Sequence, residues 1–199
     1  MAGVMPCYLI RLKNRTPGSV NRRPGKGVGT QMNLFVRFVF VLIAALRSQS
    51  SVGPLEASRL QLRVWFTDLS FSQCVPLHRI RSYTDLATVN SVMQIGLGRM
   101  VRQNGWMPII QAESIRQTGD LRLAQKFEVI TSIVGWQDNY VCYVHEFIAA
   151  GQRVAVSTML ARIIGRKGSP VPISSIAREL GAPDLSPALD PSFRQMIID

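Results

Sequence analysis

Four long extended segments in the second half of the chain constrain its fold most. They span residues 108–118, 126–136, 139–149 and 153–164. The connectors between them are short and contain the turn residues Gly119-Asp120, Gln137-Asp138 and Gly151-Gln152. Short connectors between long strands predict antiparallel pairing, because parallel strands need a long crossover. A strand of roughly ten residues reaches about 33 Å, so such a sheet can curl around a helix of roughly three to four turns.

The second of these segments is apolar on both faces. One face carries Phe127, Val129, Thr131 and Ile133, and the other carries Ile130, Val134 and Trp136. We therefore expect one face of the sheet to cover a helix and the other to meet a second copy of the chain.

Upstream of these strands the pattern is mixed. Residues 59–69 alternate apolar and polar side chains and predict another strand. Residues 70–90 show no sustained period. A helical stripe formed by Met93, Leu97, Met100 and Val101 follows, and Asn104-Gly105 predicts its C-terminal cap. The order is one strand, one helix and an antiparallel meander. It predicts an α+β fold in which a curved sheet wraps around one central helix.

The two ends of the chain differ from this body, which spans residues 53–168. Residues 1–31 carry six Lys or Arg and no acidic residue, and predict a flexible basic arm. Residues 32–52 predict an apolar helix whose uncharged core is too short for a bilayer of about 30 Å. We expect it to dock on the body or to contact a membrane surface through residues 32–46. Residues 169–199 predict a Pro-rich tail with a short helix at 174–180.

The charge and the cysteines limit the function classes. The net charge is +11, but six of these charges lie in the arm, so the rest of the chain suits an anionic small ligand as readily as nucleic acid. We do not favour a nucleic-acid partner. The three cysteines are widely separated, which gives neither a disulfide framework nor a zinc spacing. A reducing compartment fits best, and we expect a cytoplasmic protein. Membrane association through the apolar helix is the alternative to docking of that helix on the body.

Three stretches resemble a known family. They lie within residues 32–71, 93–116 and 127–155, and include RLQLRVWFTDL and GWQDNYVCYVHEF. These stretches resemble the thioesterase-like branch of the 4-hydroxybenzoyl-CoA thioesterase superfamily, whose members have the hotdog fold. The resemblance implies a homodimer that hydrolyses an acyl-CoA thioester to a free acid and CoA, without metal or cofactor. It also implies a site at the dimer seam.

The resemblance also implies where catalytic groups lie. In the family, the TDL motif is followed by a second Asp and a His-x-Asn-Asn box. A carboxylate acts as base or nucleophile, and N–H groups at a helix N-terminus hold the oxyanion. Asp68 matches the first Asp, but Ser70 stands at the second and the box is not recognisable in residues 70–90. Asp68, Asp85 and Asn90 are the candidate catalytic residues.

Each candidate also has a purely structural interpretation. Asp68 can end a strand, Asp85 can be a turn residue, and Asn90 can be an N-cap at the expected helix start.

A basic cluster near the last strand is a candidate for binding the CoA phosphates. It consists of Arg162, Arg166 and Lys167. Its alternative interpretation is a solvated strand end.

Two further alternatives remain open. The chain can be a non-catalytic hotdog protein that binds an acyl group or a partner. Because the resemblance is lost between residues 72 and 90 and before Met32, an incorrect reading frame or start is a second hypothesis. Of the two histidines, His145 is expected to be a packed or surface strand residue, and His78 fits no motif.

Overall fold

The computed structural model of the chain describes residues 53–183, 185–191, 193 and 196. The arm predicted for 1–31, the helix predicted for 32–52 and the membrane contact through 32–46 lie outside these residues and stay predictions. Of the helices within the described residues, none has the length and apolar character needed to cross a membrane.

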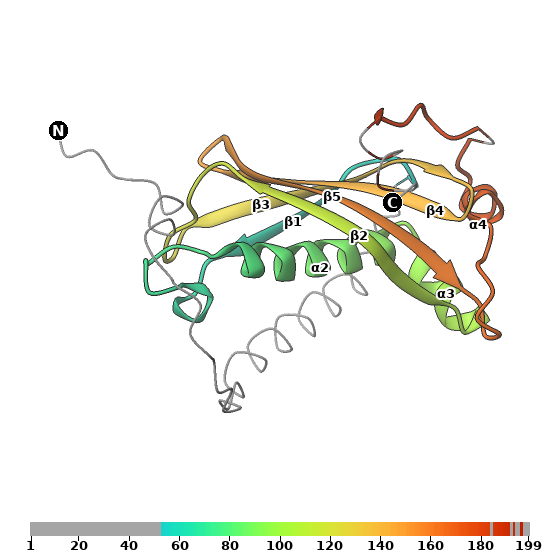
Figure 1. Cartoon of the computed structure of the whole chain (residues 1–199), viewed down its shortest axis with the longest axis horizontal. Helices are drawn as coiled ribbons and strands as arrows, with labels where there is room; N and C mark the ends of the chain where they lie inside the picture. Colours follow the sequence, from blue (N-terminus) through green and yellow to red (C-terminus); the bar gives the residue numbers. More distant parts are fainter. Residues whose placement is uncertain (1–52, 184, 192, 194–195, 197–199) are drawn as a thin grey trace, which may run out of the picture.

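The described residues form one curved antiparallel sheet in the strand order β1-β3-β4-β5-β2, with α2 along one face (Figure 1). The strands are β1 (Ser58–Arg63), β2 (Met107–Gln117), β3 (Lys126–Gln137), β4 (Tyr140–Ala149) and β5 (Gln152–Ile164). The helices are α2 (Leu77–Gln94), α3 (Leu97–Asn104) and α4 (Ile173–Glu179), and η2 (Phe66–Asp68) is a 3-10 turn. This arrangement confirms the α+β hotdog fold, a curved sheet around one central helix.

The four strands predicted after Trp106 are confirmed to within two residues at each end. Tight turns join β3 to β4 and β4 to β5, and these pairs are antiparallel as predicted. The pairing predicted across the connector at Gly119-Asp120 is wrong, because β2 pairs with β5 and not with β3. Between β4 and β5 the turn consists of Ala150 and Gly151, with φ of 50° and 75°. Two consecutive residues with positive φ give the turn type whose twist matches the flanking strands, and glycine adopts this conformation without a steric cost.

The segment 70–90, which lacks a sustained period, is mostly helical. It contains most of α2, so the helix begins at Leu77 and not near Asn90 as expected. The period is hidden because α2 buries polar residues together with apolar ones: Arg79, Thr84, Asn90 and Ser91 beside Ile80, Tyr83, Leu86 and Ala87. The segment supplies the centre of the core. The hypothesis of an incorrect reading frame in this segment stays a hypothesis.

The predicted strand 59–69 is too long. β1 ends at Arg63, and the chain then turns into η2. The turn is stabilised by the Asp68 carboxylate, whose Oδ2 accepts a 2.8 Å hydrogen bond from the Trp65 N–H. A side chain that binds backbone three residues earlier competes with strand pairing.

The predicted helical stripe is divided between two helices. Gly96, with φ of 83°, separates α2 from α3. Met93 therefore belongs to α2, whereas Leu97 and Met100 are buried residues of α3. The predicted cap at Gly105 is confirmed, because Gly105 ends α3 with φ of 64°.

A β-bulge corrects the predicted faces of β3. The register of β3 on β4 shifts between Ile133 and Gly135, so Trp136 packs on the same face as Ile133, beside α3 and α4. Val134 instead lies on the outer face, where Phe193 and Leu189 cover part of the sheet. The tail thus occupies a region of the outer face that we expected to be available to a second copy.

The core position of α2 can be tested with Ile80, which is fully buried. We expect Ile80→Ala to lower the free energy of unfolding by about 2 to 5 kcal/mol, because it leaves a cavity beneath the helix. Urea denaturation measures this change. Leu123→Ala, at a side chain that is 56% exposed, is the matched control and should change stability by no more than about 0.5 kcal/mol. Equal effects of the two changes would contradict the assigned packing.

Candidate functional site

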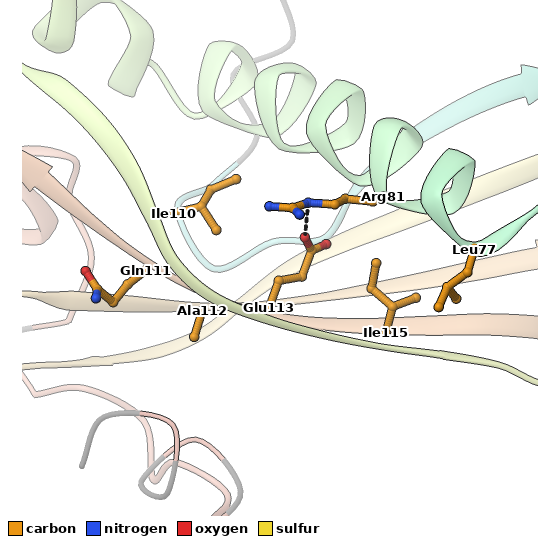
Figure 2. A pocket seen from close by; sticks show the side chains of 7 residues that line it. All are labelled: Leu77, Arg81, Ile110, Gln111, Ala112, Glu113 and Ile115. Atoms are coloured by element: carbon orange, nitrogen blue, oxygen red, sulfur yellow. Dashed lines mark ion pairs between the residues drawn. The ribbon is translucent and has the colours of Figure 1, made fainter. Parts of the chain in front are cut away.

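A pocket of about 370 Å³ lies between α2 and the edge strand β2 (Figure 2). The residues that line it are Leu77, Arg81, Ile110, Gln111, Ala112, Glu113 and Ile115. The walls are mixed: Leu77, Ile110, Ala112 and Ile115 are apolar, Gln111 is polar, and Arg81 and Glu113 provide the charges. A concave site where apolar walls meet a few convergent polar groups suits a small ligand.

Glu113 is the buried acid of this pocket. Its side chain is only 6% exposed. Ser157 Oγ on β5 donates a 3.0 Å hydrogen bond to Oε1, and Arg81 Nε on α2 lies 3.1 Å from Oε2 in an ion pair (Figure 2). The two carboxylate oxygens therefore contact side chains of two different elements, α2 and β5.

The surroundings of Glu113 raise the pKa of its carboxyl. Burial is the largest cause and raises the pKa of Glu113, and the nearby charge of Asp85 also raises this pKa. The hydrogen bond from Ser157 and the charge of Arg81 lower it. The net pKa of Glu113 lies above the ordinary 4.5. Burial also raises the pKa of Asp85, against the opposing charge of Arg81. Because the two carboxylates interact, their titrations are coupled. A carboxyl with a raised pKa is suited to accepting a proton near neutral pH.

Asp68 does not line this pocket. It is 2% exposed, and besides binding the Trp65 N–H its Oδ1 lies 3.6 Å from Arg79 Nε. Arg79 is itself buried and also donates to the Thr67 carbonyl at 3.3 Å. These contacts connect the end of β1 to the first turn of α2. The catalytic role expected for Asp68 stays a prediction.

The positions expected for Asp85 and Asn90 are corrected by the structure. Asp85 is not in a loop but on α2, one turn after Arg81, where its charge acts on Glu113. Asn90 is not an N-cap but lies buried within α2, and its Nδ2 has no hydrogen-bond partner among the described residues. The catalytic roles of both residues stay predictions. The position of Asp85 near Glu113 favours its role more than the position of Asn90 favours its own.

His78 also lies on α2, seven residues before Asp85. A separation of two turns is about 10 Å along the helix, which is too far for a direct hydrogen bond between these side chains. These two side chains therefore do not form the histidine–carboxylate pair that a catalytic triad needs.

The basic cluster lies elsewhere. Arg162 is on β5, opposite Tyr140 and Ile109 in the sheet register. Arg166 Nε donates a 3.1 Å hydrogen bond to the Asn104 carbonyl at the end of α3. Neither of these residues nor Lys167 lines the pocket, so their contact with CoA phosphates stays a prediction.

Sequence reasoning missed both charged residues of the pocket. Glu113 has the same parity on β2 as the apolar Ile115, and a carboxylate at that parity was the available signal. The β-bulge between Ile110 and Ala112, which brings Ile110 to the same face, could not be predicted. Arg81 and Asp85 have the i, i+4 spacing of a helical ion pair. That spacing carries information only once the segment is known to be a helix.

Residues 64–189 match the thioesterase-like superfamily. This match covers more than half of the chain, so the chain belongs to that superfamily. No curated protein sequence matches the chain.

Solved structures show the same fold. A DHNA-CoA thioesterase from Staphylococcus aureus is 10% identical with a TM-score of 0.56, and the alignment covers 63% of this chain and 86% of that one. YbaW, a probable thioesterase from Escherichia coli, is 13% identical with a TM-score of 0.58, over 61% and 94% of the two chains. A 1,4-dihydroxy-2-naphthoyl-CoA thioesterase from Synechocystis is 12% identical with a TM-score of 0.56, over 63% and 95%.

The buried pair of Asp68 and Arg79 yields a stability prediction. Asp68→Asn keeps an oxygen for the Trp65 N–H but removes the negative charge beside the buried guanidinium. We expect a loss of about 3 to 5 kcal/mol in the free energy of unfolding, measured by urea denaturation, because a buried charge is left uncompensated. Asp138→Asn is the control, at an exposed turn residue with φ of 53°, a conformation that asparagine tolerates. A loss no larger than that of the control would contradict the anchoring role.

Proposed function

We propose that this protein hydrolyses acyl-CoA thioesters to a free acid and CoA. The single observation that carries the proposal is the buried Glu113 carboxylate, held between Arg81 and Ser157 in the pocket at the edge of the sheet. Membership in the thioesterase-like superfamily supports the reaction class.

In the proposed mechanism Glu113 is the general base. Its carboxylate takes a proton from a water molecule as the water oxygen attacks the thioester carbonyl. The tetrahedral intermediate then collapses, the carbon–sulfur bond breaks, and CoA leaves as a thiolate that takes up a proton. The products are the carboxylic acid and CoA. A raised pKa makes the Glu113 carboxylate a stronger base than an ordinary glutamate.

The developing oxyanion needs hydrogen-bond donors. We propose that N–H groups in the first turn of α2 supply them, because the first N–H groups of a helix have no acceptor within the helix. Leu77, the first residue of α2, lines the pocket and supports this placement. The side chain of Arg81 is 61% exposed and is available to an anionic part of the substrate.

We further propose a homodimer formed through β2. In the described part of the chain β2 pairs with β5 along one side only, and it is the edge strand of the sheet. Two of its apolar side chains, Met107 and Ile110, are 63% and 38% exposed. Ile110 also lines the pocket, so a second copy at this edge would close the site.

Glu113→Gln tests the proposed base. The amide cannot accept the proton of the attacking water, so we expect kcat for an acyl-CoA substrate to fall by about 10²- to 10⁴-fold. Thiol release from a panel of acyl-CoAs measures this. In the unchanged protein, activity should decrease as the pH falls through a value above 4.5, because protonation removes the base. This decrease should disappear from the residual activity of the variant.

Glu146→Gln is the matched control. Glu146 is a strand glutamate in an ion pair with Arg153 at 2.9 Å, away from the pocket lining, and its loss should leave kcat unchanged. An unchanged protein that binds acyl-CoA but releases no thiol would overturn the enzymatic proposal in favour of a non-catalytic binding protein.

Ile110→Lys tests the proposed dimer. Two lysines brought together at the β2 edge would repel each other, so we expect the change to convert a dimer into a monomer in light scattering coupled to gel filtration. Leu123→Lys, at another exposed apolar residue outside the sheet edge, should leave the dimer intact. A monomeric unchanged protein would refute the dimer.

A further inference from the structure

His145 is a buried titratable residue that the proposed mechanism does not use. It lies on β4 with 0% exposure, and its Nδ1 is 3.0 Å from Thr131 Oγ1 on β3. Its other ring nitrogen, Nε2, is buried and has no hydrogen-bond partner among the described residues. A buried polar atom without a partner is costly and calls for an explanation.

The sheet register places His145 in a polar row that leads to Glu113. Thr131 on β3 faces His145, and His145 faces Ser157 on β5. Side chains directly opposite each other on neighbouring strands share a face, with Cβ atoms roughly 4.5 to 5.5 Å apart. Ser157 Oγ in turn donates to Glu113 Oε1. Thr131, His145 and Ser157 are each at most 1% exposed, so the row lies in the interior beneath α2.

We propose that this row is a hydrogen-bond chain with a single direction, Thr131 to His145 to Ser157 to Glu113, which positions the Glu113 carboxylate. The chemistry of the groups sets the direction. The one hydroxyl proton of Ser157 is used on Glu113, so the Ser157 oxygen can only accept from His145. Nε2 must then carry the histidine proton, and Nδ1 of the neutral ring must accept from the Thr131 hydroxyl. In the proposed row, Nε2, which has no partner among the described residues, is the donor to Ser157 after a side-chain rotation.

The ionisable groups around the row are compatible with this direction. Burial lowers the pKa of His145 to about 4, so the ring is neutral at neutral pH. Tyr143, whose ring centroid is 6.1 Å from that of His145, stays neutral because burial raises its pKa. Arg81 and Asp85 of α2 face Glu113 at the other end. Ser157 and His145 are therefore positioning residues that act through Glu113.

The histidine tautomer tests the direction without any enzymatic assay. In ¹⁵N NMR spectra of the full chain at neutral pH, we expect the proton of His145 on Nε2, with the signals assigned by comparison with His78→Gln. A proton on Nδ1, or a ring that becomes charged near pH 6.5 as an ordinary histidine does, would overturn the proposal.

The effect on Glu113 is tested by Ser157→Ala and, as a second variant, His145→Phe. We expect Ser157→Ala to raise the Glu113 pKa by about one unit, because the carboxylate loses a donor; ¹³C NMR of labelled glutamate measures it. The acid limb of kcat/KM should shift equally, and Ser157→Thr should restore both values. His145→Phe should shift them in the same direction by less. Thr158→Ala, at the next residue of β5, is the control.

The two readouts separate this inference from the proposed function on which it rests. A Glu113 pKa that shifts in a protein without thioesterase activity would support the row and overturn the function. A Glu113 pKa unchanged in both Ser157→Ala and His145→Phe would overturn the row, whatever the activity.

Discussion

The structure depends on the burial of α2 against the inner face of the sheet. The ring of Tyr83 packs against Phe127 with 4.9 Å between centroids, and Phe127 packs on Phe147 of β4. Ile80 and Leu86 are buried beside them. Burying each such side chain contributes about 1.5 to 3 kcal/mol. These apolar contacts set the position of the whole helix, so the polar residues on the same helix are buried as a consequence.

Two arginines near the start of α2 illustrate what that burial does to charge. Arg79 is buried with Asp68, and this pair connects the helix to the end of β1. Arg81 is exposed but pairs with the buried Glu113 at the edge strand. Both side chains of the Asp68–Arg79 pair are buried, whereas the exposed guanidinium of Arg81 leaves the Arg81–Glu113 pair bordering solvent at the pocket.

Much of the fold could be predicted from the sequence. The four long strands, their tight turns and the cap at Gly105 are local features, set by alternation and by turn residues. The central helix could not be located, because Thr84, Asn90 and Ser91 interrupt its apolar period while being buried. The bulge in β3 could not be predicted either, so the face of Trp136 was wrong.

The sequence by itself determined the class of fold and the superfamily, because strand alternation, turn chemistry and characteristic stretches are readable one segment at a time. Only the tertiary structure decided which acid lies in the pocket. Glu113, Arg81 and Ser157 come from three elements up to 76 residues apart in sequence, and no local pattern relates them. They meet because antiparallel pairing aligns β2 with β5 while α2 packs across the same face.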